Sequence, residues 1–577
     1  MSKSPAPITT AALRPDLLSH LHPRAFSRKW LIAALTLATI LGFGFRVVGL
    51  GSEGLSEDEL NKLQAVEDYR AHGLTSANGE HPMLMKGLQT VSIVAAERWN
   101  ATSLASAHPE SLRISVEAAL RLPSALFGAF TSVLIYLVVA ELFGAEVALI
   151  AALLWALDPT AIALNRIAKE DTFFLFFFLL ANVFWLRTQT ITESGSDRNP
   201  EPYYWATGAS FGAMTASKYM PFFIAISVSY NYAFQLLPHR RWQIGWPRYP
   251  IILAIAGLVF ILCNPAILLP DTWHRMGAFA SYRMVGHDSY EFMGKLYSHR
   301  FTDWLQGVPW YFYFVYIGVK LPLLTLAAFL IGLPQLFRKR MGDGRYFILF
   351  WMLYWAITFV FAGGKFARYF TTVLPCVLIA AALGIVVAGD LIAKRLAPIF
   401  ANRELKIPPR IILAALVLSL SSLVSAGIAP HYRLYNNQIG GGAARAGDYF
   451  PHDDFYDAPM RDCLQEIARR ARGGARVASE TPGLAQFYAE RAGRTDLKSV
   501  SLSDPAALRD FGAGDFLVIV RGRRYFSNDA LIKRLNESSK PTFSVAVGET
   551  RAADVYMLDD ATLSILASLT RADSEPR

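Results

Sequence analysis

Charge and cysteine are both scarce in this chain. Only 18% of its 577 residues are charged, against about a quarter in a typical soluble domain. By contrast, 53% are hydrophobic and 13% are aromatic. The three cysteines, Cys263, Cys376 and Cys463, lie far apart and match no metal-binding or redox spacing. The composition therefore argues against a soluble protein and against a thiol-based metal or redox site.

Long apolar runs take the place of the missing charge. A helix needs roughly 20 apolar residues to cross a bilayer, and about eleven segments approach that length. The first, 30–50, is too long and has the wrong exit for a cleaved signal peptide. The sequence predicts an α-helical polytopic membrane protein, with a transmembrane domain over 30–428. The predicted spans are 30–50, 119–142, 145–163, 172–187, 203–217, 219–237, 250–269, 311–337, 346–363, 370–389 and 410–428.

The basic residues assign the two sides of the membrane. Short connectors hold His239-Arg240-Arg241, Arg338-Lys339-Arg340 and Lys394-Arg395, and they share one side with the N-terminal segment 1–29 if every span is real. Lys and Arg mark the cytoplasmic side, so the net charge of +10 reflects topology and predicts no nucleic-acid partner. The outer side then receives 51–118, 164–171, the turn at Lys218, 270–310, 364–369 and everything after 429.

Two of the outer segments are long and polar. Residues 51–118 contain amphipathic stretches at 60–73 and 84–99, which we expect to lie on the membrane surface. Residues 429–570 are predicted to form a small soluble α/β domain, with a helix at 460–472 and strands at 516–520 and 543–547. We expect the polar tail 571–577 to be disordered.

Three adjacent carboxylates, Glu57, Asp58 and Glu59, follow the first span. Neighbouring acids raise one another's pKa, and such a carboxylate can accept a proton from a hydroxyl or hold a divalent cation. The alternative is a solvated helix start, where acids are favoured by the helix dipole. The cluster is therefore a candidate catalytic site.

Ionisable residues of both signs also stand at the ends of other outer spans. The turn 165–171 holds Lys169, Glu170 and Asp171, and another turn holds Lys218; Lys365 and Arg368 follow Gly363-Gly364, and Glu80-His81-Pro82 precedes Lys86. Cations at a membrane surface can hold a phosphate, although snorkelling explains any single one. Their collection on one face predicts a site where a phosphate leaving group and a hydroxyl acceptor meet.

The same residues fall in stretches that resemble a known family. Asp58-Glu59 follows the first span, Glu80-His81-Pro82-Met83 is similar to an (E/H)-P-P-L element without its second proline, and four longer stretches match in order: ALRLPSALFGAF (119–130), NRIAKEDTFF (165–174), GAMTASKYMPF (212–222) and GKFARYFTTVLP (364–375). GVPWYFYFVYIGVKLPL (307–323) looks like a middle span, and Gly440-Gly441-Gly442 with DDFYDAP (453–459) resembles the start of the soluble domain in bacterial members. The chain resembles the C-type glycosyltransferases, in particular the protein O-mannosyltransferase and aminoarabinose transferase superfamily.

The resemblance implies roles for individual residues. It implies transfer of a sugar, with inversion, from undecaprenyl- or dolichyl-phosphate to an acceptor hydroxyl on a protein, glycan or lipid, at the periplasmic or extracellular face of the cell (inner) membrane. It places Asp58 as general base with Glu59 beside it and Asp171 as a second acid. The residues it suggests for binding the carrier phosphate or sugar are Lys86, Lys169, Lys218, Lys365, Arg368, Tyr369 and His81. It implies no cofactor and no obligatory metal.

Two other classes of protein remain open at this point. A polytopic transporter or flippase of lipid-linked sugars would have its site near the bilayer midplane, often between related halves, whereas the charges here lie at span ends and no related halves are evident. A membrane-anchored binding protein would work through residues 429–577 alone and would tolerate loss of the acids at 57–59.

Overall fold

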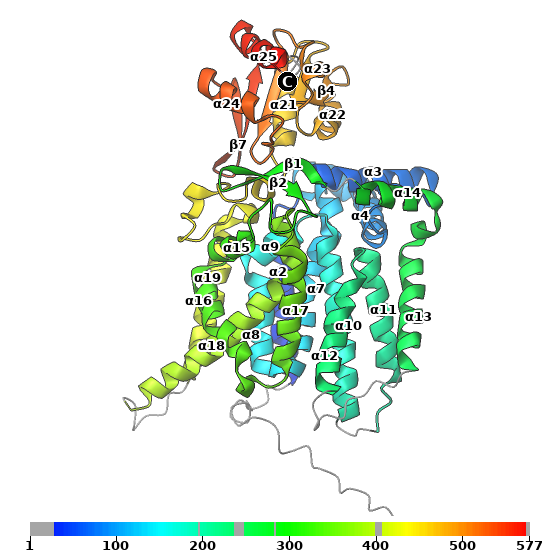
Figure 1. Cartoon of the computed structure of the whole chain (residues 1–577), viewed down its shortest axis with the longest axis vertical. Coiled ribbons are helices and arrows are strands. Elements are labelled where there is room, and N and C mark those ends of the chain that lie inside the picture. Colours follow the sequence, from blue (N-terminus) through cyan, green and yellow to red (C-terminus); the bar gives the residue numbers. More distant parts are fainter. Residues whose placement is uncertain (1–27, 194–196, 236–246, 282–283, 399–406, 573–577) are drawn as a thin grey trace, which may run out of the picture.

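The computed structural model describes residues 28–193, 197–235, 247–281, 284–398 and 407–572. Helices that run roughly side by side form a bundle, short helices and a hairpin cover one end of it, and a small sheet domain stands above them (Figure 1). Most of the predicted N-terminal segment 1–29, the basic connector 239–241, and most of the tail 571–577 lie outside the described residues.

Each predicted span contains a helix of the bundle. Five described helices are long and apolar enough to cross a membrane, and α8 with α9, bent by 61° at their junction, would make a sixth; the count of eleven stays a prediction. The bundle helices are α2 (Arg28–Val47), α7 (Val116–Phe143), α8 (Ala145–Leu157), α9 (Pro159–Asn165), α10 (Glu170–Glu193), α11 (Glu201–Ser217), α12 (Ile224–Gln235), α13 (Arg248–Cys263), α15 (Phe312–Lys320), α16 (Leu323–Gly332), α17 (Gly344–Phe359), α18 (Leu374–Leu396) and α19 (Pro409–Ile428).

The bend between α8 and α9 has a local cause. Pro159 cannot continue the hydrogen-bond ladder of α8, and the buried Asp158 side chain instead caps α9 by accepting from the N–H groups of Thr160 and Ala161. The guanidinium of Arg46 in α2 donates to Asn165 Oδ1 at 3.0 and 3.1 Å, at the end of α9. These contacts fix the turn between α9 and α10, which carries charged residues.

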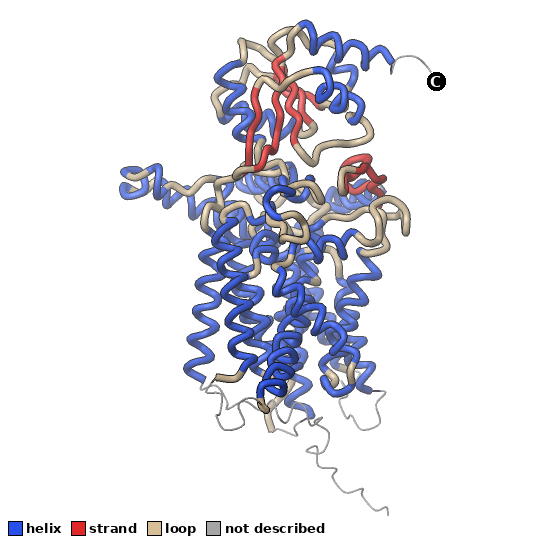
Figure 2. Tube along the Cα trace, turned by 90° about the vertical axis from the view of Figure 1, so that its left-hand side faces the viewer, coloured by secondary structure: helices blue, strands red, loops and turns tan. Residues whose placement is uncertain are grey.

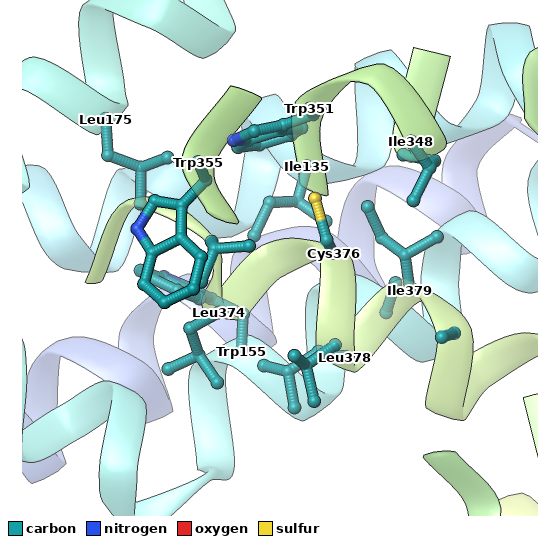
Figure 3. Packing of buried hydrophobic residues seen from close by; sticks show 14 of the residues in the cluster. Ile135, Trp155, Leu175, Ile348, Trp351, Trp355, Leu374, Cys376, Leu378 and Ile379 are labelled. Carbon is teal, nitrogen blue, oxygen red and sulfur yellow. The ribbon is translucent and has the colours of Figure 1, made fainter. Parts of the chain in front are cut away.

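Two buried tryptophans of α17 hold the turn that precedes α18. Trp351 donates its indole N–H to the carbonyl of Thr372, and Trp355 donates to the carbonyl of Tyr369. Both acceptors lie in the 3₁₀ helix η6 (Ala367–Thr372). Figure 3 shows these indoles packed in the core with Cys376, which is fully buried among apolar side chains. The core of the bundle therefore positions η6.

The layer above the bundle contains three helices and a hairpin: α3 (Glu57–His72), α4 (Leu84–Asn100), α14 (Pro270–Ser281), and strands β1 (Met284–Phe292) and β2 (Lys295–Arg300). The stretches predicted to be amphipathic are helices α3 and α4. Helix α14 and the hairpin were not predicted from the sequence. Met293 and Gly294 form the hairpin turn, both with positive φ, as two-residue hairpin turns commonly require.

The C-terminal domain contains a five-stranded sheet in the order β4-β3-β5-β7-β6. Strand β3 is parallel to β4 and β5, and β7 is antiparallel to β5 and β6; Figure 2 shows the sheet with its helices. The elements are α21 (Met460–Arg470), β3 (Arg476–Ser479), α22 (Pro482–Arg491), β4 (Lys498–Ser501), α23 (Pro505–Leu508), β5 (Phe516–Val520), α24 (Asp529–Ser538), β6 (Phe543–Val547), β7 (Thr550–Met557) and α25 (Asp560–Ala572).

The segment between α19 and α21 packs against the bundle as well as against the sheet. Asn437 donates to the carbonyls of Gly318 and Leu321. Further along, the buried Asp454 in α20 (Pro451–Phe455) lies 2.8 Å from Lys320 Nζ. Residues from the start of the predicted soluble domain are therefore built into the top of the bundle, and the sheet domain itself begins at α21.

Candidate active site

A cavity of about 330 Å³ lies between the bundle and the C-terminal domain. Its walls come from the start of α3, the turns before α10 and after α11, the hairpin, η6, α20 and the chain after β5. Seven of the predicted site residues line it: Asp58, His81, Lys169, Asp171, Lys218, Arg368 and Tyr369. The structure thus brings together residues that are distant in the sequence. The volume of the cavity falls within the range of small-molecule sites.

Asp58 lies in the first turn of α3. Ser56 begins this helix with a capping box, in which its side chain accepts from the Glu59 N–H and Glu59 accepts from the Ser56 N–H. This cap fixes where the helix starts and so directs the next two side chains. The sequence expectation of a helix start is correct, but of the three acids only Glu59 is fully buried, whereas the side chains of Glu57 and Asp58 are 43% and 35% exposed.

Two cations and a hydroxyl surround the Asp58 carboxylate. Oδ2 lies 3.1 Å from Lys169 Nζ and 3.2 Å from Arg368 Nη1, and it accepts a hydrogen bond from the Tyr456 hydroxyl at 3.0 Å. Burial alone would raise the pKa of Asp58, but the charges of Lys169 and Arg368 outweigh it and hold that pKa well below its usual value. Asp58 is therefore ionised, and its charge is compensated by its neighbours.

A second ion pair stands beside the first. Lys218 Nζ lies 2.6 Å from Asp171 Oδ1 and 4.9 Å from the centre of the Tyr369 ring. The guanidinium of Arg368 lies over the Phe366 ring at 4.0 Å. Aromatic faces attract cations and restrict their orientation. The cations of the cavity are thus paired with carboxylates, and two of them, Lys218 and Arg368, also lie over aromatic rings.

His81 belongs to a third charged group at the edge of the cavity. Its Nδ1 lies 3.4 Å from Glu170 Oε1, and Lys62 Nζ lies 2.7 Å from the same oxygen. Burial lowers the pKa of His81 well below its usual value, so its imidazole is neutral at physiological pH. Its role in binding substrate stays a prediction.

Glu59 does not line the cavity, contrary to its expected catalytic place. Its side chain is fully buried and accepts two hydrogen bonds from Arg121, at 2.8 and 2.6 Å, and one from the Ala168 N–H. Arg121 also donates to the carbonyls of Leu50 and Gly54. Glu59 therefore joins α3, α7 and the turn before α10, and its geometry is that of a structural residue.

Lys86 and Lys365 also lie outside the cavity. The Lys86 ammonium donates to the carbonyls of Ala77, Asn78 and His81, at 2.7 to 3.2 Å. Lys365 donates to the carbonyls of Val308 and Ala362. The two ammonium groups thus donate to backbone carbonyls rather than to the cavity, where a phosphate would bind. The prediction that Lys86 and Lys365 bind the carrier is corrected. Both lysines hold the loops beside the site in place.

Several residues of the cavity were not singled out from the sequence. They come from the hairpin, α20 and the loop after β5: His287, Ser289, Tyr290, His299, His452, Tyr456, Arg523 and Tyr525. None stands at the end of a predicted span, which was the signal used to find candidates. Of these residues only Tyr456 lies in a stretch, 453–459, whose sequence resembles that of the family.

Among the residues that the structure describes, no group of three or more His, Cys, Asp or Glu side chains could hold a metal ion. The carboxylates of the cavity are paired with Lys and Arg instead. That the reaction needs no obligatory metal stays a prediction from the resemblance.

Comparisons with known proteins show a partial family match and a similar fold. The family model of dolichyl-phosphate-mannose-protein mannosyltransferases matches residues 110–268, and no curated protein matches the chain. The oligosaccharyltransferase of Archaeoglobus fulgidus in the apo form is 13% identical, with a TM-score of 0.51 over 86% of this chain and 70% of that one. The complex of that organism's AglB with an inhibitory peptide and a dolichol-phosphate is 12% identical, with a TM-score of 0.50 over the same shares.

A third structure, ArnT from Cupriavidus metallidurans bound to undecaprenyl phosphate, is 13% identical with a TM-score of 0.48, over 92% of this chain and 98% of that one. Over most of its length the chain shares the helical fold of the Archaeoglobus fulgidus oligosaccharyltransferase. The family model covers three of the stretches that resemble the protein O-mannosyltransferases in sequence, 119–130, 165–174 and 212–222.

Proposed function

We propose that the protein is a membrane glycosyltransferase that moves a sugar from a polyprenyl-phosphate carrier to an acceptor hydroxyl, with inversion. The observation that supports this most is the placement of Lys169 and Arg368 on either side of Asp58, within 3.2 Å of one oxygen. A phosphate leaving group needs fixed cations, an attacking hydroxyl needs a base, and here both lie in one cavity.

The cations would receive the carrier phosphate. Arg368 presents several N–H donors in a planar arrangement that suits phosphate oxygens, and Lys169 and Lys218 add positive charge in the same cavity. The side chain of Arg368 is 12% exposed and that of Lys218 is 19% exposed, so both are accessible from the cavity. Stabilising the charge that develops on the departing phosphate lowers the barrier to transfer.

Asp58 would act as the base. The acceptor oxygen forms a bond to the anomeric carbon while the bond from that carbon to the phosphate oxygen breaks. The hydroxyl proton passes to Asp58, and the carrier phosphate leaves with the bonding electrons. Once a phosphate occupies Lys169 and Arg368, these cations compensate the Asp58 charge less, so donor binding would make the carboxylate a stronger base.

The position of the cavity suits a lipid-linked substrate. It lies at the end of the bundle, so a prenyl chain can stay in the bilayer while its phosphate reaches the cations. The last turn of α18, with Lys394 and Arg395, lies at the opposite end of the bundle (Figure 1). Because basic residues mark the cytoplasmic side, the cavity and C-terminal domain are proposed to face the periplasm or cell exterior.

Mass spectrometry of cell-envelope glycolipids and glycoproteins tests this proposal. Cells that lack the gene should lose one mass increment, which identifies sugar and acceptor together. The wild-type gene should restore it, and Asp58→Asn, an isosteric change, should not. Asp510→Asn changes an exposed aspartate of the C-terminal domain and serves as the matched control. An unchanged envelope after deletion, or full restoration by Asp58→Asn at equal protein level, contradicts the proposal.

A further inference from the structure

The first turn of α3 separates two charged networks. Asp58 points to Lys169 and Arg368, as described above. Its neighbour Glu57 instead has Oε2 at 3.3 Å from Arg523 Nη1 and at 3.7 Å from His287 Nε2. Arg523 follows β5 of the C-terminal domain, and His287 lies on β1. The wall of the cavity away from the phosphate-binding cations is therefore built by the hairpin and the C-terminal domain.

Buried contacts fix this wall. Arg523 is 8% exposed and donates from Nε to the fully buried Asp457 at 2.6 Å. The same Asp457 accepts from the backbone N–H of Glu57 at 3.1 Å. Asp457 has a φ of 61°, a left-handed conformation that is uncommon for a residue other than glycine. Such conformations persist when surrounding contacts determine them, and they gather at functional sites.

An aromatic stack holds His287. Its ring lies 4.1 Å from that of Tyr525, with 16° between the planes. Arg523 Nη1 is 3.1 Å from the Tyr525 hydroxyl and 2.9 Å from His287 Nε2. A guanidinium can only donate, so Nε2 accepts in this contact with Arg523. The hairpin is also attached to the same loop, because Asp288 accepts from the N–H groups of Phe526 and Ser527.

Two members of the network remain accessible. The side chain of Glu57 is 43% exposed and that of His287 is 29% exposed, and both line the cavity. Burial alone would raise the pKa of Glu57, but the contact with His287 and the charge of Arg523 together outweigh it and lower that pKa. The cavity thus contains an ionised carboxylate and an imidazole ring within one small area, held in place by buried groups.

We propose that Glu57 and His287 form a second subsite of the cavity, which binds neighbouring hydroxyl groups of a pyranose sugar ring. A carboxylate accepts from two hydroxyls at once, an imidazole nitrogen forms a hydrogen bond with a third oxygen, and a flat ring packs against the C–H face of a sugar. The negative charge of Glu57 disfavours a phosphate, so the subsite differs in chemistry from the Lys169–Arg368 side. Arg523, Tyr525 and Asp457 are positioning residues.

This inference rests on the proposed function, and the sugar ring has two potential sources. It belongs either to the donor or to a glycan acceptor. Lipid extract from cells without the gene supplies unconsumed donor, and their washed envelope fraction supplies acceptor. Release of free carrier phosphate by the purified full-length protein, measured by mass spectrometry, then reports donor hydrolysis without the envelope fraction and sugar transfer with it.

The variants are Glu57→Gln, which is isosteric, and His287→Ala. Glu67→Gln, on the exposed part of α3, is the matched control. Each of the two variants should lower transfer by about tenfold or more, as loss of a hydrogen bond to a charged group predicts. Their affinity for undecaprenyl phosphate, which has no sugar, should stay within about twofold of wild type, because the phosphate side is intact.

The outcomes separate the sources. If hydrolysis and transfer both fall, the ring is that of the donor; if transfer alone falls, the ring is that of the acceptor. Wild-type transfer by both variants overturns the inference while leaving the proposed function intact. Equal losses of undecaprenyl phosphate affinity and transfer also overturn it, since the residues would then serve the phosphate. A wild-type protein without transfer overturns the proposed function itself, and the inference with it.

Discussion

Lys218 Nζ lies 2.6 Å from Asp171 Oδ1, and the two residues stand 47 positions apart at the ends of separate helices of the bundle. The side chain of Asp171 is 4% exposed and that of Lys218 is 19% exposed. The pair is a direct contact between two of the stretches that were selected from the sequence by their shared side of the membrane. Substitution of either residue therefore tests whether Lys218 stabilises the protein or binds substrate.

Lys218→Gln should lower the thermal stability of the detergent-solubilised protein, because Asp171 is left as a buried charge without its partner. Removing one member of a buried pair costs roughly 3–5 kcal/mol, less here because Lys218 is partly exposed. The double variant Lys218→Gln/Asp171→Asn should regain most of the lost stability. Equal melting temperatures for the single variant and wild type would show that the pair contributes little.

The pH dependence of kcat/KM should change in Lys169→Gln. The low pKa of Asp58 in the free protein comes from the charges of Lys169 and Arg368, which outweigh burial. With one cation removed, this pKa rises, so the acid limb of kcat/KM, which reports groups of the free enzyme, should move to higher pH. The control is Lys540→Gln, at an exposed position. An acid limb that stays in place would show that Asp58 does not control it.

The same cause sets how Asp58 contributes to stability. Its pKa is lower in the folded than in the unfolded protein, so its stabilising contribution is present above the unfolded value of about 3.9. That contribution is lost as the pH falls through the folded value. Lys169→Gln raises the folded value and should therefore reduce this contribution, so between neutral pH and about pH 3 the melting temperature of the variant should fall less than that of wild type.

Glu59→Gln should mainly impair stability. Its carboxylate accepts from Arg121 at 2.6 and 2.8 Å inside the protein, and loss of its charge leaves that guanidinium without a counter-charge, at a cost of roughly 3–5 kcal/mol. The fraction that stays folded should turn over within a few-fold of wild type. A variant with normal melting temperature and no turnover would restore Glu59 to a catalytic role.

Substitutions of Arg368 and of the two lysines Lys86 and Lys365 should differ in their effect on undecaprenyl phosphate affinity. Arg368→Gln removes a donor that lines the cavity and should weaken binding by about ten- to a hundredfold, as expected for a hydrogen bond to a charged group. Lys86→Gln and Lys365→Gln should bind as wild type but melt at a lower temperature. Binding can be followed by titration of the purified protein in detergent. A loss of affinity in the two lysine variants alone would reverse the assignment.

Sequence patterns predicted the bundle and one half of the cavity. Apolar runs located the helices of the bundle, since a helix in lipid must be long and apolar, and charges at the ends of the predicted spans pointed to Asp58, Asp171, Lys218 and Arg368. The amphipathic stretches became α3 and α4. These features succeed because the bilayer imposes a simple rule on each segment by itself.

The other half of the cavity depends on contacts that no single segment reveals. His287 lies in a hairpin that no sequence pattern predicted, and Arg523 lies in the C-terminal domain, far in the sequence from the predicted span ends. Glu59 and Lys86 carry the residue types of a site, but their partners, Arg121 and three backbone carbonyls, are defined only by the folded chain. Composition cannot distinguish a charge that faces a cavity from one that is satisfied behind it.

The central claim is that Asp58 supplies the base while its two cationic neighbours hold the carrier phosphate. Measuring undecaprenyl phosphate affinity and sugar transfer on one preparation of Asp58→Asn tests it directly. Affinity should equal or exceed that of wild type, because Lys169 and Arg368 lose their competing carboxylate. Transfer should fall by about 10² to 10⁴, the usual contribution of a general base. Transfer at the wild-type rate, or loss of phosphate binding together with transfer, would contradict the account.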